Sequence, residues 1–419
     1  MCDSRIPTKK KGGRTMLTAV NSSGEVVSLF RSYTRAEAIS LKEKGPYFCR
    51  ECSESLILKA GIKRIPHFAH HMHSRCPESY ENESQYHLNG KIKLYNWLHQ
   101  KGVSPVMEYY YHEIQQRADI GFIYKEQSFA IEFQCSPISE DLFYKRTQSY
   151  LHAGIIPIWI IGANKIKRID YNRMALTSFN YLFLSLYERK SWEILAFCPN
   201  TMHFILLKNP LPYSAKNTFA NLQIKPLKNL DLSTLLHLPI DSSPISFQQW
   251  QTVIRKQKDF AAVRNSSFSK SILYELYDHR ISPSQLPSEI GLPVFHSPYI
   301  STPPVQWQTF LMMDVILKKK TFTISDAKTS FYKRVRSKSV SLRRFPLLDE
   351  SEEFRAVEEY FNLLEHLYII SKTDEGGYFV SNKLKFPYSQ NEQVQYDQSL
   401  NKRFGKYIMK QASQNQFDK

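Results

Sequence analysis

Two apolar segments, residues 117–124 and 128–135, constrain the fold of this chain more than any other feature. A tight connection, Lys125-Glu126, lies between them, so we expect two antiparallel strands joined by a turn. The second segment carries Glu132 within the apolar run 129–133. A buried carboxylate is costly unless it has a partner. The pattern therefore predicts a buried strand whose acidic residue has a specific role.

The surrounding sequence supplies the other elements of an α/β domain. Residues 81–100 have helical periodicity, and residues 103–111 form a further strand candidate. Residues 139–152 are predicted as a helix with Ser139 as its N-cap, followed by a short apolar strand at 155–161. The expected order of elements is α-β-β-β-α-β.

Three polar residues on the paired strands form the strongest candidate site. Glu132 and Gln134 are two residues apart and share one strand face, and antiparallel pairing brings Asp119 near that face. Two converging carboxylates repel one another unless a proton or a cation lies between them. Oxygen ligands suit Mg²⁺ or Mn²⁺, which can activate water against a phosphodiester. An exposed strand edge with ordinary charges is the alternative, and the apolar surroundings of Glu132 argue against it.

The preceding helix adds Glu83, His87 and Lys91, whose spacing of four residues puts them on one face. Glu83 could ligate or orient the metal, and His87 or Lys91 could contact phosphate. On the later helix, Arg146 and Tyr150 could contact a nucleic-acid backbone. A solvated helix face remains an alternative for all of these residues.

A second group of metal-binding residue types lies in a short segment that precedes this domain. It comprises Cys49, Cys52, His67, His70, His71, His73 and Cys76. The Cys-x2-Cys pair followed by His and Cys has structural-zinc spacing. We favour Cys49, Cys52, His67 and His70 as ligands, with Cys76 as the main rival to either His. A reduced thiol pair beside a His-rich loop is the alternative.

The charge of the chain points to a polyanionic partner. Lys and Arg outnumber Asp and Glu by 56 to 39, a formal net charge of +17, which favours nucleic acid. We find no apolar stretch of about 18 residues and expect no membrane span. The six cysteines are too sparse for a disulfide scaffold, so a reducing, cytoplasmic location is expected.

The chain divides by composition into five parts. We expect a disordered leader at 1–15, a metal-binding module at 16–80, an α/β domain at 81–165, connecting strands and a linker at 166–242, and a helical region at 243–419. The helical region contains a basic run between Lys333 and Arg344 that could contact phosphates. Its helices, followed by a Gly376-Gly377 hairpin, suggest a winged-helix arrangement. The last roughly 30 residues are polar and are expected to be frayed.

Several of these motifs together resemble the competence protein CoiA family. They are Met16-Leu17-Thr18-Ala19, Pro66-His67-Phe68-Ala69-His70, Glu83-Ser84-Gln85-Tyr86-His87 with Lys91, Ala118-Asp119, and Ile131-Glu132-Phe133-Gln134-Cys135-Ser136. The resemblance implies a restriction-endonuclease-like domain of the PD-(D/E)XK superfamily behind a zinc-finger-like N-terminal domain. It also implies a role in natural transformation, in which incoming DNA is processed or recombined.

The resemblance also assigns roles to residues. It implies that Asp119 and Glu132 ligate a metal, that Glu83 is the helix acid, and that Gln134 occupies the position where the superfamily commonly has Lys. Glutamine supplies neither a positive charge nor a general base, so it can only orient water or substrate. The expected function is a Mg²⁺- or Mn²⁺-dependent DNA nuclease. A non-catalytic DNA-binding recombination factor and a protein-interaction scaffold are the alternatives, with recombination or DNA-uptake proteins as further partners.

Overall fold

The computed structural model describes most of the chain and shows a mixed α/β protein. The described residues are 15–30, 35–61, 64–71, 74, 76, 83–187, 191–236, 245–263, 268–348, 352–381 and 384–413. Residues 1–14 of the expected leader, His73 and the expected linker residues 242–244 lie outside them. The chain forms two compact units, one comprising Met1–Lys165, Ala196–Ile205 and Lys225–Leu236, and the other comprising the remainder. Among the described residues, no helix is long and apolar enough to cross a membrane.

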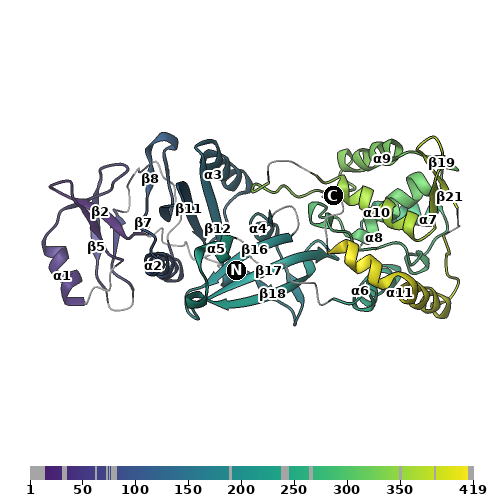
Figure 1. Ribbon diagram of the computed structural model, residues 1–419, viewed down its shortest axis with the longest axis horizontal. Helices are drawn as coiled ribbons and strands as arrows, with labels where there is room; N and C mark the ends of the chain where they lie inside the picture. The colour runs from purple at the N-terminus through teal and green to yellow at the C-terminus, as the bar shows by residue number, and fades with distance from the viewer. Residues whose placement is uncertain are drawn as a thin grey trace, which may run out of the picture. The chain divides into compact units, whose positions relative to one another are not determined.

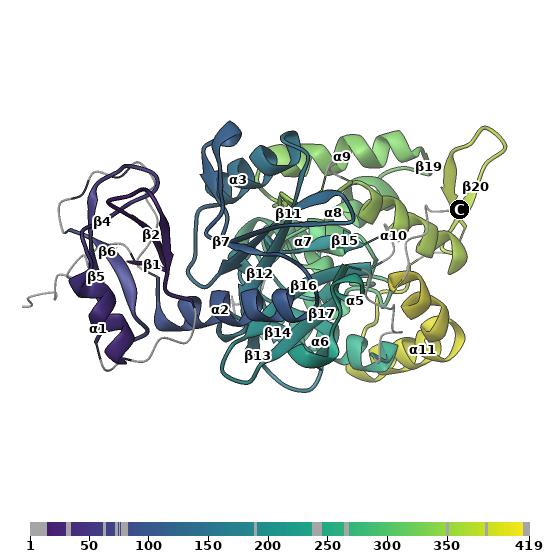
Figure 2. The ribbon, with the colours of Figure 1, turned by 60° about the vertical axis from the view of Figure 1, so that its left-hand side comes forward.

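The first unit begins with a small antiparallel sheet in the order β1-β6-β5-β4-β2-β3, beside helix α1 (Arg35–Glu43) (Figure 2). The strands are β1 (Thr15–Met16), β2 (Thr18–Asn21), β3 (Val26–Ser28), β4 (Tyr47–Phe48), β5 (Ser55–Lys59) and β6 (His67–His70). Met16, Leu58 and Phe68 are buried in its core together with Cys49 and Cys76. A core this small gives the module limited folding free energy of its own.

A second sheet of the first unit contains the predicted hairpin. Strands β10 (Ile120–Tyr124) and β11 (Gln127–Gln134) pair antiparallel up to Tyr124 and Gln127. Lys125 and Glu126 have φ angles of 49° and 64°, as a two-residue turn of this twist requires. Strand β12 (Ile155–Gly162) pairs parallel with β11, and β7 (Val106–Met107) pairs with β10 on its other side. The hairpin predicted from the sequence is therefore confirmed.

The short segments between β7 and β10 are β8 (Tyr110–Tyr111), the 3-10 turn His112–Ile114 and β9 (Gln116–Arg117). The main elements of this domain follow the expected order, α2, β7, β10, β11, α3 and β12.

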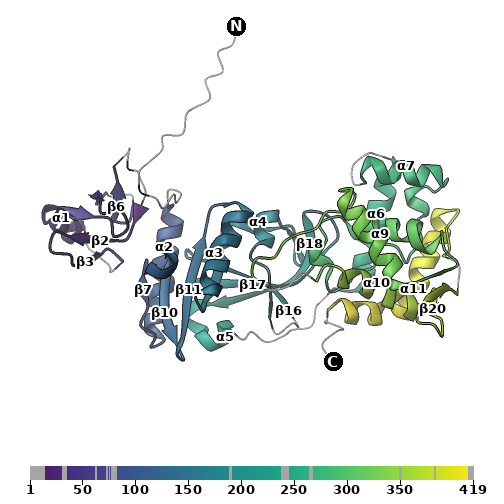
Figure 3. The same ribbon diagram turned by 90° about the horizontal axis from the view of Figure 1, so that it is seen from above.

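Helices α2 (Gln85–Gln100) and α3 (Glu140–His152) cover opposite faces of β11 (Figure 3). The hydroxyl of Ser139 caps α3 by accepting from the Leu142 N–H, as predicted. Phe133 faces α2 so closely that a Cβ added at Gly90 would lie 1.9 Å from its ring. Its neighbour Glu132 points to the opposite face, because successive strand residues alternate.

The second unit combines strands with a helical C-terminal region (Figure 1). The strands are β13 (Lys167–Arg168), β14 (Arg173–Ala175), β15 (Ser185–Tyr187), β16 (Ser191–Cys198), β17 (His203–Pro212) and β18 (Asn217–Pro226). Parts of β16, β17 and β18 belong to the first unit. Strands β16 and β17 are neighbours in the sheet, within the region where connecting strands were expected.

The region 243–419 is mostly helical in the described residues, as predicted. The helices of the chain not yet named are α4 (Ser178–Tyr181), α5 (Leu232–Leu236), α6 (Phe247–Val263), α7 (Lys270–Asp278), α8 (Pro304–Leu311), α9 (Ile324–Arg336), α10 (Arg355–His366) and α11 (Gln390–Ala412). Strands β19 (Thr321–Phe322), β20 (Ile370–Lys372) and β21 (Tyr378–Val380) form a sheet in the order β19-β21-β20. The suggested winged-helix arrangement stays a prediction.

The expectation of a frayed C-terminal tail is wrong for most of its length. Residues Gln390–Ala412 form α11, and Leu400, Ile408 and Ala412 are buried in the core of the second unit. Polar residues dominate the composition of this segment, but Leu400, Ile408 and Ala412 fall on one helical face that packs into the core.

The basic run between Lys333 and Arg344 is divided between structural and exposed residues. The Arg334 guanidinium contacts both oxygens of Glu275 and both oxygens of Asp314. Arg343 donates to the carbonyl oxygens of Pro298 and Ile300 and lies over the ring of Tyr181. Lys333, Arg336 and Lys338 are exposed. Fewer residues of this run are therefore available to contact phosphate than expected, because Arg334 and Arg343 make contacts within the fold.

Candidate functional site

Glu83, His87 and Asp119 come together at the N-terminal end of α2. One ligand atom from each of these residues lies within 4.8 Å of the others. Ser84 caps α2 by accepting from the His87 N–H, which fixes the start of the helix beside Glu83. Asp119 directly precedes β10. Two side chains from the start of α2 and one from a segment more than 30 residues later thus face one point.

Asp119 is held in an ionised state by its neighbours. Its Oδ2 accepts hydrogen bonds from the backbone N–H of Phe133 at 2.8 Å and from His87 Nε2 at 3.1 Å. Burial alone would raise the pKa of Asp119, but the charges of His87 and Lys91 hold it well below its usual range. The side chains of His87 and Asp119 are each 15% exposed, so the group is reachable from solvent.

A buried ammonium group lies among the carboxylates. Lys91 Nζ donates to both oxygens of Glu83, at 2.9 and 3.0 Å, and lies 3.5 Å from Asp119 Oδ1. It also donates to Glu108 Oε1 at 2.7 Å. Burial favours a lower pKa for Lys91, but Glu108, Glu83 and Asp119 outweigh burial and raise it above the usual value. Lys91 is therefore charged and fully paired.

Glu108 is a member of this network that the sequence analysis missed. It is 1% exposed and accepts hydrogen bonds from the backbone N–H groups of Leu17 and Thr18 at 3.0 Å each. Burial favours a higher pKa for Glu108, but Lys91 and Arg117 lower it to about 2. Glu108 lies in the apolar and aromatic run 106–110, the same signal that marked Glu132.

Glu132, the expected second metal ligand, lies outside the group of Glu83, His87 and Asp119. Its Oε1 accepts from the Arg146 guanidinium and from the Tyr150 hydroxyl, the latter at 2.5 Å. Burial raises the pKa of Glu132; Arg146 opposes this effect and the charge of Asp119 adds to it. Glu132 projects to the α3 face, because it is the strand neighbour of Phe133, which faces α2.

Two further predicted residues are engaged in hydrogen bonds within the fold. Arg146, expected to contact phosphate, is 7% exposed and also donates to the carbonyl oxygen of Arg117 at 3.0 Å. The Gln134 amide donates to the carbonyl oxygen of Ser136 at 2.7 Å. Both side chains would have to leave these partners in order to contact a substrate.

The donor set of Glu83, His87 and Asp119 fits a divalent cation. Two carboxylates and one imidazole supply hard oxygen and borderline nitrogen ligands, which suit Mn²⁺ and, with added waters, Mg²⁺. The carboxylates of Glu83 and Asp119 attract a cation to this point.

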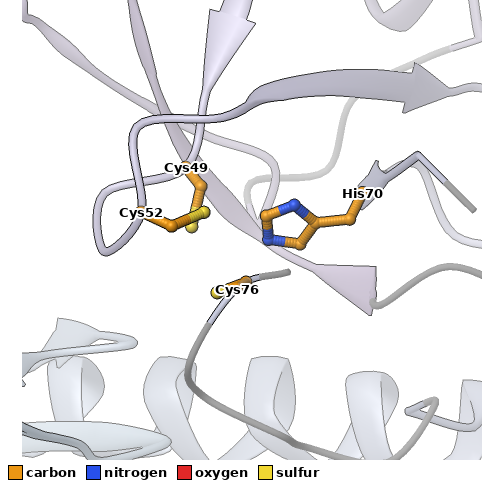
Figure 4. Close-up of side chains that lie close together, drawn as sticks. All are labelled: Cys49, Cys52, His70 and Cys76. Atoms are coloured by element: carbon orange, nitrogen blue, oxygen red, sulfur yellow. The ribbon is translucent and has the colours of Figure 1, made fainter. Parts of the chain in front are cut away.

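A second group of donors forms in the N-terminal module. Cys49, Cys52, His70 and Cys76 place one ligand atom each within 4.8 Å of the others. The imidazole of His70 points toward the three sulfur atoms (Figure 4). Its Nδ1 lies 3.0 Å from the Ser74 hydroxyl, which orients the ring. Three thiols and one imidazole are the donors of a closed structural zinc site.

His67, one of the favoured zinc ligands, lies outside this group. Its Nδ1 lies 2.8 Å from the carbonyl oxygen of Ile65. His67 and His70 are three residues apart on β6, and an odd separation puts two strand residues on opposite faces. Cys76, the rival considered from the sequence, takes the fourth place.

Comparisons with known proteins agree with the resemblance seen in the sequence. Three family models match successive parts of the chain: "Competence protein CoiA, N-terminal domain" at 30–79, "Competence protein CoiA, nuclease-like domain" at 83–239 and "Competence protein CoiA, C-terminal domain" at 246–394. The competence protein CoiA of Bacillus subtilis (strain 168) is 29% identical over 359 residues, which are 84% of this chain and 94% of the relative. No solved structure gives a significant match. The three family matches and the long alignment with one relative show that the chain belongs to the competence protein CoiA family.

Proposed function

We propose that this protein is a metal-dependent DNA nuclease that processes incoming DNA during natural transformation. The observation that carries the proposal is the group of Glu83, His87 and Asp119, whose ligand atoms lie within 4.8 Å of one another in the nuclease-like domain. The order α2, β7, β10, β11, α3, β12 supports a restriction-endonuclease-like core, and the net charge of +17 supports a nucleic-acid substrate.

In the proposed mechanism, Glu83, His87 and Asp119 hold Mg²⁺ or Mn²⁺. When bound, the ion supplies Lewis-acid activation of water and of the scissile phosphodiester. Asp119 is fixed for this role by the Phe133 N–H, which sets the direction of its carboxylate. Lys91 supplies positive charge next to the phosphate, and Gln134, once released from Ser136, orients water. Glu132 remains a proposed second ligand, which requires it to leave Arg146 and Tyr150.

The N-terminal module is proposed to hold one structural Zn²⁺ at Cys49, Cys52, His70 and Cys76. The charge of the chain and the exposed lysines of its C-terminal region support DNA as the partner. We place the protein in the cytoplasm, where a reducing medium keeps Cys49, Cys52 and Cys76 available for the metal.

A non-catalytic DNA-binding recombination factor is the second candidate function. The contact between the Gln134 amide and Ser136, at 2.7 Å, favours it, because the residue at the usual Lys position is engaged with the backbone and carries no positive charge. Under this alternative the chain binds DNA with the same salt dependence but leaves it intact.

Nicking of supercoiled plasmid decides between the two functions. The full-length protein is incubated with plasmid and Mg²⁺, with Mn²⁺, or with EDTA. We expect metal-dependent nicking that is lost in Asp119→Asn and retained in Asp278→Asn, which changes an exposed carboxylate on α7 in the same way. Absence of nicking with either metal would reject the nuclease and favour the DNA-binding factor. Equal nicking by Asp119→Asn would reject the assigned site and place the metal centre elsewhere in the chain.

A further inference from the structure

The Lys91 ammonium occupies the oxygen atoms that a metal ion would need. It contacts both oxygens of Glu83, at 2.9 and 3.0 Å, and lies 3.5 Å from Asp119 Oδ1. An ammonium ion and a divalent cation compete for the same carboxylate lone pairs. A metal ion at Glu83, His87 and Asp119 would therefore lie close to the Lys91 ammonium, and their repulsion favours withdrawal of Lys91 from at least one of these carboxylates.

Lys91 has one acidic partner that lies outside the metal-binding group. Its Nζ donates to Glu108 Oε1 at 2.7 Å, the shortest of its carboxylate contacts among the described residues. The side chain of Lys91 is 1% exposed, so an ammonium displaced from Glu83 has no direct route to water. A buried cation needs a partner, and Glu108 already provides it.

Glu108 is itself fixed by the N-terminal strands. Its Oε2 accepts from the Thr18 N–H at 3.0 Å and from the Thr18 hydroxyl at 2.7 Å, and its Oε1 accepts from the Leu17 N–H at 3.0 Å. Its φ angle is 52°, which a residue with a Cβ rarely adopts. Such a conformation persists where surrounding contacts determine it, and it occurs often at functional sites.

We propose that Glu108 is the positioning residue of the metal centre: it retains the Lys91 ammonium when a divalent cation takes Glu83 and Asp119. The inference rests on the metal centre of the proposed function and adds how that centre is controlled. Lys91 and the metal compete for Glu83 and Asp119, and Glu108 reduces the cost of that competition. Lys91 then remains beside the metal as the positive charge that Gln134 cannot supply.

The proposal is tested by Mn²⁺ binding to full-length, zinc-loaded protein without DNA, measured by the loss of the free-Mn²⁺ electron paramagnetic resonance signal. Removing the competitor in Lys91→Met should tighten Mn²⁺ binding by about tenfold or more. Removing the alternative partner in Glu108→Gln should weaken it by a similar factor. Asp119→Asn should lose the site, which assigns the measured affinity to this group.

The double variant Lys91→Met/Glu108→Gln separates competition from general electrostatics. In the parent, the carboxylates of Glu83, Glu108 and Asp119 and the ammonium of Lys91 sum to a formal charge of −2. In the double variant, the two remaining carboxylates, those of Glu83 and Asp119, also sum to −2. The double variant should nevertheless bind Mn²⁺ more tightly than the parent. Lys93→Met, which removes a lysine from the same helix, is the matched control and should change the affinity little.

Thr18→Val tests positioning without changing any charge. It removes the hydroxyl donor to Glu108 and should weaken Mn²⁺ binding in the parent but not in the Lys91→Met background. A merely structural role for Glu108 predicts equal weakening in both backgrounds, and that result would overturn the proposal. So would a double variant that binds no more tightly than the parent.

Circular dichroism melting accompanies each measurement. If Lys91→Met alone does not fold, the charge-matched double variant decides the question by itself. Because no cleavage is measured, a protein that binds Mn²⁺ in the expected order but leaves plasmid intact would contradict the nuclease function and support this inference.

Discussion

Arg117 and Glu51 form a salt bridge that joins the two candidate metal centres, with Nη1 2.6 Å from Oε1. Glu51 lies between Cys49 and Cys52 in the candidate zinc group, and Arg117 lies two residues before Asp119. Both side chains are largely buried, so the contact is only weakly screened by salt. The loop that would hold zinc is therefore in direct contact with β9, the strand that ends two residues before Asp119.

Zinc content should distinguish the two possible fourth ligands. Full-length protein prepared without a His-tag should contain one zinc per chain by elemental analysis. Cys76→Ser should lose that zinc and melt at a lower temperature, because metal binding supplies much of the folding free energy of a small module. His67→Ala is the matched control and should keep the metal, since His67 faces away from Cys49. Zinc retained by Cys76→Ser and lost by His67→Ala would restore the ligand set favoured from the sequence.

Glu132→Gln should destabilise the protein, whatever it does to cleavage. The substitution leaves the buried Arg146 guanidinium without its carboxylate, and breaking a buried pair in this way costs about 3–5 kcal/mol. Urea denaturation in EDTA measures the loss. Replacing Arg146 by Met in the same chain removes the uncompensated charge and should recover part of the stability. If the urea midpoint of Glu132→Gln equals that of the parent, the pair of Glu132 and Arg146 contributes no net stabilisation.

Asp119→Asn should abolish metal-dependent cleavage, with a loss of more than ~100-fold, since removing even an outer-shell contact costs 10–100-fold. The amide keeps the shape of the side chain and retains one oxygen for the Phe133 N–H. Rates are followed by plasmid nicking with saturating Mn²⁺. Cleavage at the parent rate would place the metal centre elsewhere in the chain.

The exposed basic residues of α9 and the turn after it should contribute to DNA affinity. Replacing Lys333, Arg336 and Lys338 by Ala should weaken binding and reduce the slope of log affinity against log salt by about 2–3, because each phosphate contact contributes about 0.9. Fluorescence anisotropy at several salt concentrations measures the slope. Alanine at the exposed Lys402, Lys406 and Lys410 of α11 removes the same charge and is the control. Equal effects of the two triple variants would mean that charge, not the α9 surface, determines binding.

The buried Lys258 should make stability rise with pH. Burial, together with the charge of Arg255, lowers the pKa of Lys258 from 10.5 to about 7, although its Nζ donates to the Pro287 carbonyl oxygen at 2.7 Å. Between about pH 7 and 10.5 the unfolded chain binds the extra proton, so this group adds about 1.4 kcal/mol of stability per pH unit. Below pH 7 both states are protonated and the cost of the buried charge is constant.

Lys258→Met should therefore stabilise the protein most near pH 7, and the benefit should vanish as the pH approaches 10.5. Urea denaturation of parent and variant at pH 7 and pH 9.5 provides the comparison. A stability difference that is the same at both pH values would show that Lys258 remains charged in the folded protein.

The sequence by itself determined those features that depend on local spacing. Local backbone geometry determines three of these features. They are the Lys125-Glu126 turn, the Ser139 cap and the alternation that puts Glu132 and Phe133 on opposite strand faces. The sequence also identified Asp119 and the Cys49-Cys52 pair as candidate metal ligands, because an acidic residue next to an apolar strand and two closely spaced thiols can be recognised in the sequence.

The tertiary structure decided which side chains meet. Whether Asp119 contacts His87 or Glu132 depends on how closely α2 packs on β11, and the absence of a side chain at Gly90 sets that approach. The choice of Cys76 over His67 depends on the position of Cys76 beside Cys49, Cys52 and His70, and the role of Glu108 depends on hydrogen bonds from Thr18, 90 residues away. Contacts of such sequence separation are fixed by the packing of whole elements, which no local pattern encodes.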